Sequence, residues 1–397
     1  YAAVLADAIA INGTVTAANA AVGAGNFTYN NQTGEMNSLG KTATVMQMIF
    51  PEYSIDISNL GGIKANSISM VGNTLGLGVR NKGTITANAA LAMTSYGSLV
   101  NEGSINTNGL MAKMASLGDM KNTGTINSTA YVTQLSSVGT LTNEGTIASS
   151  KQIAISATGD LVNAGTMKGT QLLSVASGGN LTTRKGSNTV SDGQLAVSAN
   201  NIDNAGSMRG NITNVAFSGD KLKVTGELRG HSTLTVQSKK DDKVNSGLIY
   251  NTGSISGNDV TIITNGNLDQ EGNIIGQNSL SIKSNVLDNV YYIYGKSLNI
   301  ESNYVRNRAT IDGYSNTISA ANGILNEGQI SASGDLTLRT LNHANITNYN
   351  TIKANGSLTM TTGTVKNGGY RCGFLNLATC GKGSISANKL VLNSYHN

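Results

Sequence analysis

Hydrophobic and polar positions alternate in short stretches along most of this chain, and Gly or Asn residues separate the stretches. Alternation with period two predicts β-strands that bury one face. The segment after Asn143 illustrates the pattern, since its aliphatic positions are Ile147, then Ile153 and Ile155, then Leu161. The residues between them are small or polar. We therefore predict three short strands, each with its aliphatic side chains on one face.

An Asn-x-Gly triplet precedes each such group of strands and returns with a period of about twenty residues. A fixed period of this size is the sequence signature of a solenoid. We predict an all-β fold, a right-handed parallel β-helix of about 16 or more coils of roughly 20 residues. The right-handed sense follows the usual chirality of parallel crossovers. The clearest triplets begin at Asn81, Asn101, Asn122, Asn143 and Asn163.

The Asn and Gly of each triplet are interpreted as structural residues and not as ligands. We expect the Gly to take a positive φ at a corner, where a Cβ atom would clash. We expect the Asn to tolerate left-handed geometry and to bond its own backbone. Stacked Asn amides can also form hydrogen bonds from one coil to the next.

Irregular stretches divide the chain into three parts, which are residues 1–58, 59–223 and 224–397. The first part is an irregular start with an excursion at 24–54, which either shields an end of the helix or forms part of a binding surface. The second part contains the regular coils. The third part contains degenerate coils, and its charged stretch at 239–250 reads as an exposed loop that is either simply solvated or makes contacts.

A loop at 367–383 contains both cysteines, Cys372 and Cys380. An even cysteine pair in an export-like chain of low charge favours a disulfide. Binding residues concentrate on loops held by rigid scaffolds, and aromatic and Arg side chains dominate hot spots. The alternative is a stapled protrusion without a partner. The partner-binding candidates in this loop are Tyr370, Arg371, Phe374 and Leu375.

Tyrosines gather in the later coils and form a second group of candidates. With Ile293 directed inward, Tyr292 and Tyr294 point outward. Outward tyrosines on neighbouring coils could stack into a strip that binds protein or glycan. The alternative is the ordinary β-propensity of tyrosine at surface positions. The candidates are Tyr292, Tyr294, Tyr304 and Tyr314.

Composition changes this picture in two respects. Only 12% of the 397 residues are charged and 48 are Gly, which fits an extracellular β-rich surface. The net charge of +5 is spread thinly, so we predict no nucleic-acid partner. The chain has no apolar run long enough to span a membrane as a helix. Residues 1–11 lack a basic leader, and we expect the chain to be a segment excised from a longer protein.

The sequence contains no motif that is typical of a catalytic site. Polysaccharide-degrading β-helices need clustered acids on one face, and no acidic pair recurs here at coil spacing. The three His and two Cys residues show no metal-ligand spacing. We therefore predict no catalytic residue, no cofactor and no metal site, and we expect that the protein is not an enzyme.

The repeat unit resembles that of filamentous haemagglutinin and of related two-partner secretion exoproteins (the TpsA family). These include the CdiA-type effectors of contact-dependent growth inhibition. The resemblance covers residues 59–397 and, more weakly, 1–58. Residues that fit the unit one by one are Asn81, Gly83, Ile85, Leu91, Met93, Gly97 and Leu99.

This resemblance implies a secreted, monomeric rod at the surface of a Gram-negative cell, exported through an outer-membrane secretion partner. It implies a binding or stalk segment, and we expect it to recognise a protein receptor on a target bacterium during contact-dependent inhibition. A host-directed adhesin rod is the first alternative, and a passive spacer is the second. A polysaccharide-degrading β-helix enzyme is the remote alternative.

Overall fold

The computed structural model describes all residues except 31, 40–51, 240–246, 373–377, 381 and 395–397. The chain is all-β, and its parallel coils stack into a β-solenoid of about 17 turns. The coils fall into two compact units, Tyr1–Ala199 with Ala205–Ser207 (unit 1) and Asn200–Asn204 with Met208–Asn397 (unit 2). The predicted parallel β-helix is confirmed, and its right-handed sense stays a prediction. The described part of the chain has no helix long and apolar enough to cross a membrane.

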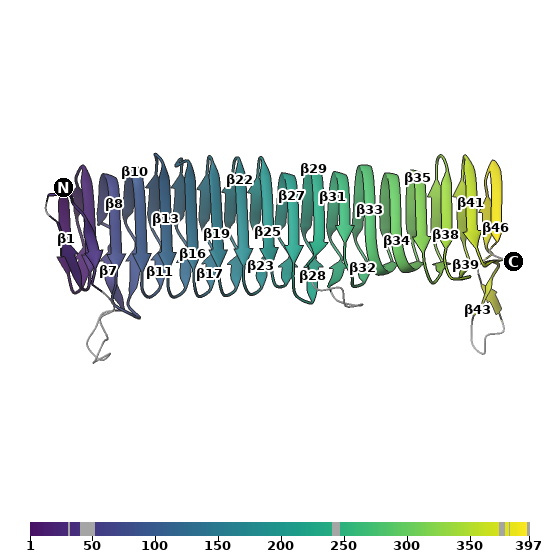
Figure 1. Ribbon diagram of the computed structural model, residues 1–397, viewed down its shortest axis with the longest axis horizontal. Helices are drawn as coiled ribbons and strands as arrows, with labels where there is room; N and C mark the ends of the chain where they lie inside the picture. The colour runs from purple at the N-terminus through teal and green to yellow at the C-terminus, as the bar shows by residue number, and fades with distance from the viewer. Residues whose placement is uncertain (31, 40–51, 240–246, 373–377, 381, 395–397) are drawn as a thin grey trace. The chain divides into compact units, whose positions relative to one another are not determined.

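Unit 1 begins with an irregular portion and continues as regular coils (Figure 1). Its strands are β1 (Ala2–Ala6), β2 (Ile9–Ile11), β3 (Thr14–Thr16), β4 (Asn19–Ala24), β5 (Phe27–Tyr29), β6 (Met36–Ser38), β7 (Tyr53–Ile57), β8 (Gly62–Gly72), β9 (Gly78–Asn81), β10 (Thr84–Ser95), β11 (Leu99–Asn101), β12 (Ser104–Thr107), β13 (Met111–Ser116), β14 (Met120–Asn122), β15 (Thr125–Ser128), β16 (Val132–Ser137), β17 (Leu141–Asn143), β18 (Thr146–Ser149), β19 (Gln152–Ala157), β20 (Leu161–Asn163), β21 (Thr166–Gly169), β22 (Leu172–Ser177), β23 (Leu181–Thr183), β24 (Asn188–Ser191) and β25 (Gln194–Ala199).

In unit 2 the strands are often longer, because neighbouring strands of one coil merge. They are β26 (Ile202–Asn204), β27 (Ser207–Phe217, whose first residue belongs to unit 1), β28 (Lys221–Val224), β29 (Glu227–Ser238), β30 (Leu248–Asn251), β31 (Ser254–Ile263), β32 (Leu268–Gln270), β33 (Asn273–Asn289), β34 (Tyr292–Asn307), β35 (Thr310–Ala320), β36 (Ile324–Asn326), β37 (Gln329–Ala332), β38 (Leu336–Thr340), β39 (Asn345–Asn348), β40 (Thr351–Ala354), β41 (Ser357–Thr362), β42 (Thr364–Asn367), β43 (Tyr370–Cys372), β44 (Ala378–Cys380), β45 (Ser384–Ser386) and β46 (Lys389–Ser394).

Each coil consists of three segments, as the sequence pattern predicts. In the coil formed by β18, β19 and β20, the first segment follows the Asn-x-Gly triplet and the third ends at the next triplet's Asn. Each segment pairs in parallel with its counterpart one coil later, and the equivalent aliphatics are in register. Ile147 pairs with Met167, and Leu161 pairs with Leu181.

The aliphatic positions of all three segments point into one dry core. The predicted set Ile147, Ile153, Ile155 and Leu161 is at most 1% exposed. Burying one such side chain contributes about 1.5–3 kcal/mol. The residues that alternate with them are half-buried or exposed, which confirms the predicted period of two.

The triplet asparagines form an amide ladder inside the solenoid. Each is at most 2% exposed, and the Nδ2 of the first four donates to the Oδ1 of the next asparagine, whereas Asn163 Nδ2 donates to Thr189 Oγ1 at 3.0 Å. In unit 1 these distances are 2.8 Å from Asn81 to Asn101, 2.8 Å from Asn101 to Asn122, 2.8 Å from Asn122 to Asn143 and 2.9 Å from Asn143 to Asn163. The coil before Asn81 has Ile57 in this position, so the Asn81 Oδ1 is left without a hydrogen bond. The predicted stacking of Asn amides is confirmed.

Unit 2 has an equivalent ladder. Asn289, Asn307, Asn326, Asn348 and Asn367 bond in sequence at 2.7–2.8 Å. In an earlier coil Gln270 replaces an asparagine, and its Oε1 accepts from Asn251 at 2.7 Å. Each amide also donates to backbone carbonyls, for example Asn122 Nδ2 to Gly124 O at 3.2 Å. The expected bond from the Asn to its own backbone is therefore confirmed.

The triplet glycines have a different role from the one we expect from the sequence. Gly103, Gly124, Gly145 and Gly165 do not have positive φ, so the expectation of left-handed corners is wrong for these residues. The described non-glycine residues with positive φ are Asn342 and His343, and so the ladder asparagines are not left-handed either. A Cβ on Gly124 would lie 2.0 Å from the Gly103 carbonyl oxygen. The glycine is needed because successive corners stack too closely to admit a side chain.

Two antiparallel hairpins interrupt the parallel coils. In unit 1, β5 pairs with β6, within the excursion at 24–54. In unit 2, β43 pairs with β44 and projects away from the coils (Figure 1). Most of the second half of the excursion, residues 40–51, lies outside the described residues.

Candidate functional site

A row of charged and aromatic side chains runs along the outer face of the third segments in unit 2. Parallel register aligns six of these positions on successive coils, from Asp203 to Arg306, and the other five lie two residues from a position of this row. We call this surface the charged strip. Its residues are Asp203, Lys221, Lys223, Tyr250, Asp269, Glu271, Asp288, Tyr304, Arg306, Arg308 and Glu327.

The strip is held together by ion pairs between neighbouring coils. Lys223 Nζ lies 3.4 Å from Asp203 Oδ2, and Arg306 Nε lies 2.8 Å from Glu327 Oε2. The Arg308 guanidinium pairs with both oxygens of the Asp288 carboxylate. These pairs are partly exposed, so each contributes only about 0–1 kcal/mol to stability. Their main effect is to fix the side chains in defined positions.

Tyr250 contacts strip residues of the coil before it and of the coil after it. Its hydroxyl donates to Glu271 Oε2 at 3.1 Å, and this bond raises the pKa of Tyr250 above its ordinary value. Lys221 Nζ lies 5.0 Å from the centre of the Tyr250 ring, in a cation–π contact. Because the ring is fixed on both sides, a partner would meet an ordered aromatic surface.

The middle of the strip is acidic. Burial raises the pKa of the Asp269 carboxyl, and the neighbouring carboxylates of Asp288 and Glu271 add to the effect. Asp269 and Asp288 are register partners on adjacent coils, so their charges repel directly. A cationic group of a partner would relieve this repulsion.

The predicted tyrosine candidates lie on different faces of the coils. Tyr292 and Tyr294 face outward on the first segment of β34, and Ile293 is fully buried between them, as expected. Their rings stack along the strand, with centroids 6.4 Å apart and planes inclined by 8°. Tyr304 lies on the charged strip, where burial raises its pKa. Tyr314 is 57% exposed on β35, in the next coil.

These positions modify the expected tyrosine strip. Tyr292 and Tyr294 stack within one strand and not from coil to coil. Their register partners are Asn273 and Ile275 on one side and Thr310 and Asp312 on the other. The four tyrosine candidates therefore do not form one strip from coil to coil, and among them only Tyr304 belongs to the charged strip.

The cysteine loop is only partly described. Phe374 and Leu375 lie outside the described residues, as does most of the charged loop at 239–250. For Tyr370, Arg371 and both cysteines, the structure describes the backbone alone. In the β43–β44 hairpin, Cys372 is the register partner of Ala378, and Cys380 is the partner of Tyr370. The Cys372–Cys380 disulfide stays a prediction.

Sequence reasoning missed most of the charged strip, although a signal for it exists. The outward position of the third segment comes directly before the ladder amide, as Tyr250 precedes Asn251 and Arg306 precedes Asn307. Reading this one position in every coil collects six of the eleven strip residues from the sequence, and the other five lie two residues from this position. In unit 1 the same position carries three charged residues among seven, which are Asp56, Arg80, Val100, Lys121, Thr142, Val162 and Thr182.

The strip is a surface of ion pairs and aromatic side chains. Its acids are paired with cations or with Tyr250, apart from Asp269. Among the residues that the structure describes, no group of three or more His, Cys, Asp or Glu side chains is placed to hold a metal ion.

Comparison with known proteins gives one informative similarity. A stretch of 58 residues is 41% identical to "Toxin CdiA" of Yersinia pestis, and the match covers 14% of this chain and 2% of that protein. No protein-family model matches the chain, and no solved structure matches it. The short match and the β-solenoid fold are together compatible with the stalk of a secreted exoprotein of this kind.

Proposed function

We propose that this chain is an extracellular, non-enzymatic binding segment of a large secreted bacterial exoprotein. In this proposal unit 2 recognises a protein receptor on a target bacterial cell, and the parent protein acts in contact-dependent growth inhibition from a Gram-negative cell surface. The similarity to "Toxin CdiA" of Yersinia pestis carries the proposal. The solenoid supports it, since a stack of coils holds binding residues on a rigid frame.

The charged strip is the surface that we assign to the receptor. Tyr and Arg are enriched among binding hot spots, and the strip presents Tyr304 and Arg306 on one coil and Tyr250 three coils before them. Their ordered partners reduce the entropy lost on binding. The Asp269 carboxylate, which has no cationic partner within the strip, favours a basic group on the receptor, because complementary charge supplies specificity.

The test uses intact Gram-negative bacteria and the labelled full chain. We expect saturable binding that disappears when the bacteria are treated with protease. Tyr304→Ala and Arg306→Ala should each weaken binding about tenfold or more, as for hot-spot residues. Lys121→Ala is the matched control, because Lys121 occupies the equivalent position in unit 1 and pairs with Glu144 at 3.1 Å. It should leave binding within about twofold, since it lies outside the strip.

Other outcomes separate the alternatives. Binding to epithelial cells but not to bacteria would favour a host-directed adhesin. Absence of binding to either cell type would contradict the receptor-binding function and support a passive spacer. An equal loss with the Lys121 variant would contradict the assignment to the charged strip.

A further inference from the structure

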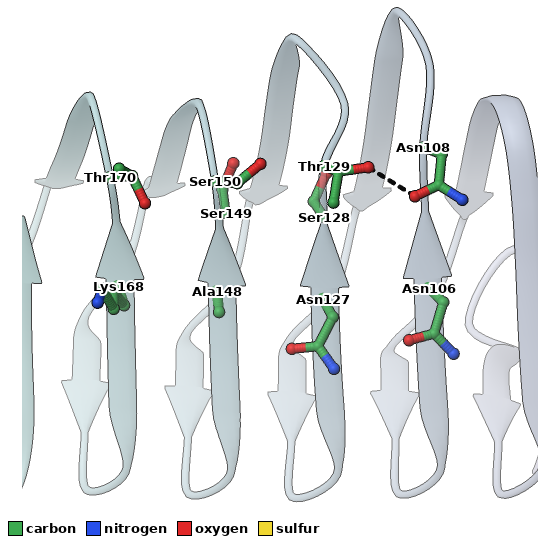
Figure 2. Close-up of a pocket in the computed structure, with 10 residues that line it drawn as sticks. All are labelled: Asn106, Asn108, Asn127, Ser128, Thr129, Ala148, Ser149, Ser150, Lys168 and Thr170. Atoms are coloured by element: carbon green, nitrogen blue, oxygen red, sulfur yellow. Dashed lines mark hydrogen bonds between the residues drawn. The ribbon is translucent and has the colours of Figure 1, made fainter.

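A polar groove crosses the outer face of unit 1, away from every residue considered so far as a site. It has a volume of about 350 Å³ and spans the first segments β12, β15, β18 and β21. Figure 2 shows its side chains in two rows, one on the strands and one at the corners above them. The lining residues are Asn106, Asn108, Asn127, Ser128, Thr129, Ala148, Ser149, Ser150, Lys168 and Thr170.

The groove carries amides and hydroxyls but no carboxylate. Its one charged group, the Lys168 ammonium, already pairs with Asp192 at 3.3 Å. Thr129 Oγ1 donates to Asn108 Oδ1 at 2.6 Å, which fixes the corner row. The Asn127 amide forms no hydrogen bond with any other residue that the structure describes. A neutral ligand rich in hydrogen-bonding groups suits this lining.

A notch interrupts the strand row. Register places Asn106, Asn127, Ala148 and Lys168 side by side on successive coils. Ala148 contributes only a methyl group between two longer side chains, and Figure 2 shows the resulting gap beside Asn127. The notch therefore combines a small apolar floor with an adjacent carboxamide, which has both donors and an acceptor.

This chemistry matches an acetamido group. Such a group has one methyl, one N–H donor and one carbonyl acceptor, so its methyl can contact Ala148 while its amide pairs with Asn127. The hydroxyls of Thr129 and Ser150 lie on the adjacent corner row and can bond sugar hydroxyls. Coils repeat at about 4.8 Å, so the polar groups of the corner row recur at this spacing along the groove.

We propose that this groove binds a neutral oligosaccharide of N-acetylhexosamine units, with one acetamido group in the notch at Ala148. The site is independent of the charged strip, and it gives the chain a second class of ligand on a cell surface.

The test is titration of the full chain with chitohexaose, with cellohexaose as the comparison because it lacks acetamido groups. We expect chitohexaose to bind at least tenfold more tightly than cellohexaose. Ala148→Leu, which fills the notch, and Asn127→Ala, which removes the amide, should each weaken chitohexaose binding at least tenfold. Ala154→Leu is the matched control, since Ala154 is exposed on β19 of the same coil, and it should change binding less than twofold.

Four results would overturn the proposal. They are no chitohexaose binding by the unaltered chain, equal binding of the two sugars, equal loss with Ala154→Leu, and tighter binding of the polyanion heparin than of chitohexaose. Circular dichroism of each variant shows whether the solenoid remains folded. If Ala148→Leu unfolds the chain, Asn127→Ala decides the outcome, because Asn127 is exposed and makes no contact that the fold requires.

Discussion

Replacing Asn122 with alanine tests whether the internal amide ladder stabilises unit 1. Asn122 is 2% exposed, and its Nδ2 donates to Asn143 Oδ1 at 2.8 Å and to the carbonyls of Gly124 and Thr146, each at 3.2 Å. Its Oδ1 accepts from Asn101 Nδ2 at 2.8 Å. Alanine removes all four hydrogen bonds and adds none.

The expected loss of unfolding free energy depends on which of the partners of Asn122 keep a hydrogen bond. Asn101 Nδ2 keeps its bonds to the carbonyls of Gly103 and Thr125, so it loses only one of three. Asn143 Oδ1 loses its donor and stays buried, which costs about 1–3 kcal/mol. The lost bond from Asn101 adds a net ~0.5–1.5 kcal/mol, while the Gly124 carbonyl keeps its bond from the Thr146 N–H. We therefore expect Asn122→Ala to lower the free energy of unfolding by about 2–4 kcal/mol, a large effect for one substitution.

The measurement is urea unfolding combined with hydrogen exchange of the backbone amides in β14, β15 and β17. Exchange resolves the affected coils, which is necessary because long repeat arrays can depart from two-state unfolding. Thr123→Ala is the control, since Thr123 is the exposed middle residue of the same triplet. The double variant Asn122→Ala with Asn143→Ala completes a double-mutant cycle. Asn143→Ala should lower the free energy of unfolding less in the Asn122→Ala background than in the unaltered chain, because it removes the Asn143 Oδ1 that Asn122→Ala leaves without a donor. If Asn122→Ala and Thr123→Ala had equal effects, the ladder would not stabilise the coils.

Three further substitutions test other contacts. Gly124→Ala should destabilise unit 1 measurably in urea because its Cβ would lie 2.0 Å from a backbone oxygen, whereas Gly13→Ala, with no atom within 4 Å, should not. The hydrogen bond from Arg80 lowers the pKa of Asp56, so this pair stabilises the fold above the ordinary carboxyl pKa, and the contribution disappears as the pH falls through the lowered value. Asp56→Asn should therefore reduce the melting temperature at pH 6 more than at pH 3. Ile155→Ala should cost about 2–5 kcal/mol in urea unfolding, as expected for a cavity in a packed core.

The coil architecture could be predicted from the sequence because it depends on inward positions. The three-segment pattern, the aliphatic core and the stacking of amides all follow from a period that the chain repeats, as in the coil from Ile147 to Leu161. The role of the glycines could not be predicted in the same way. Positive φ and close coil contact both require glycine, and only coordinates distinguish the 2.0 Å approach at Gly124 from a left-handed turn.

The candidate site was less predictable for a related reason. Alternation shows that Tyr292 and Tyr294 point outward, but it does not show which face of the coil carries them. Three faces exist, and a shift of a few residues within a coil moves a side chain to another face. Tyr304 is twelve residues from Tyr292 in sequence and lies on the charged strip, whereas Tyr292 lies on the first segment.

Outward positions are where this solenoid can acquire function without losing its fold. The inward positions are constrained by the core and the ladder in both units, as Ile153 and Leu280 show by being at most 1% exposed. The outward position before the ladder amide varies from coil to coil. It is charged in three of the seven coils from Asp56 to Thr182 in unit 1, and it is charged or aromatic in all six coils from Asp203 to Arg306 in unit 2. Charges at this position add little stability, since exposed pairs contribute about 0–1 kcal/mol. Stability therefore does not explain the run of charged and aromatic side chains in unit 2, whereas the proposed receptor-binding function gives a reason for it.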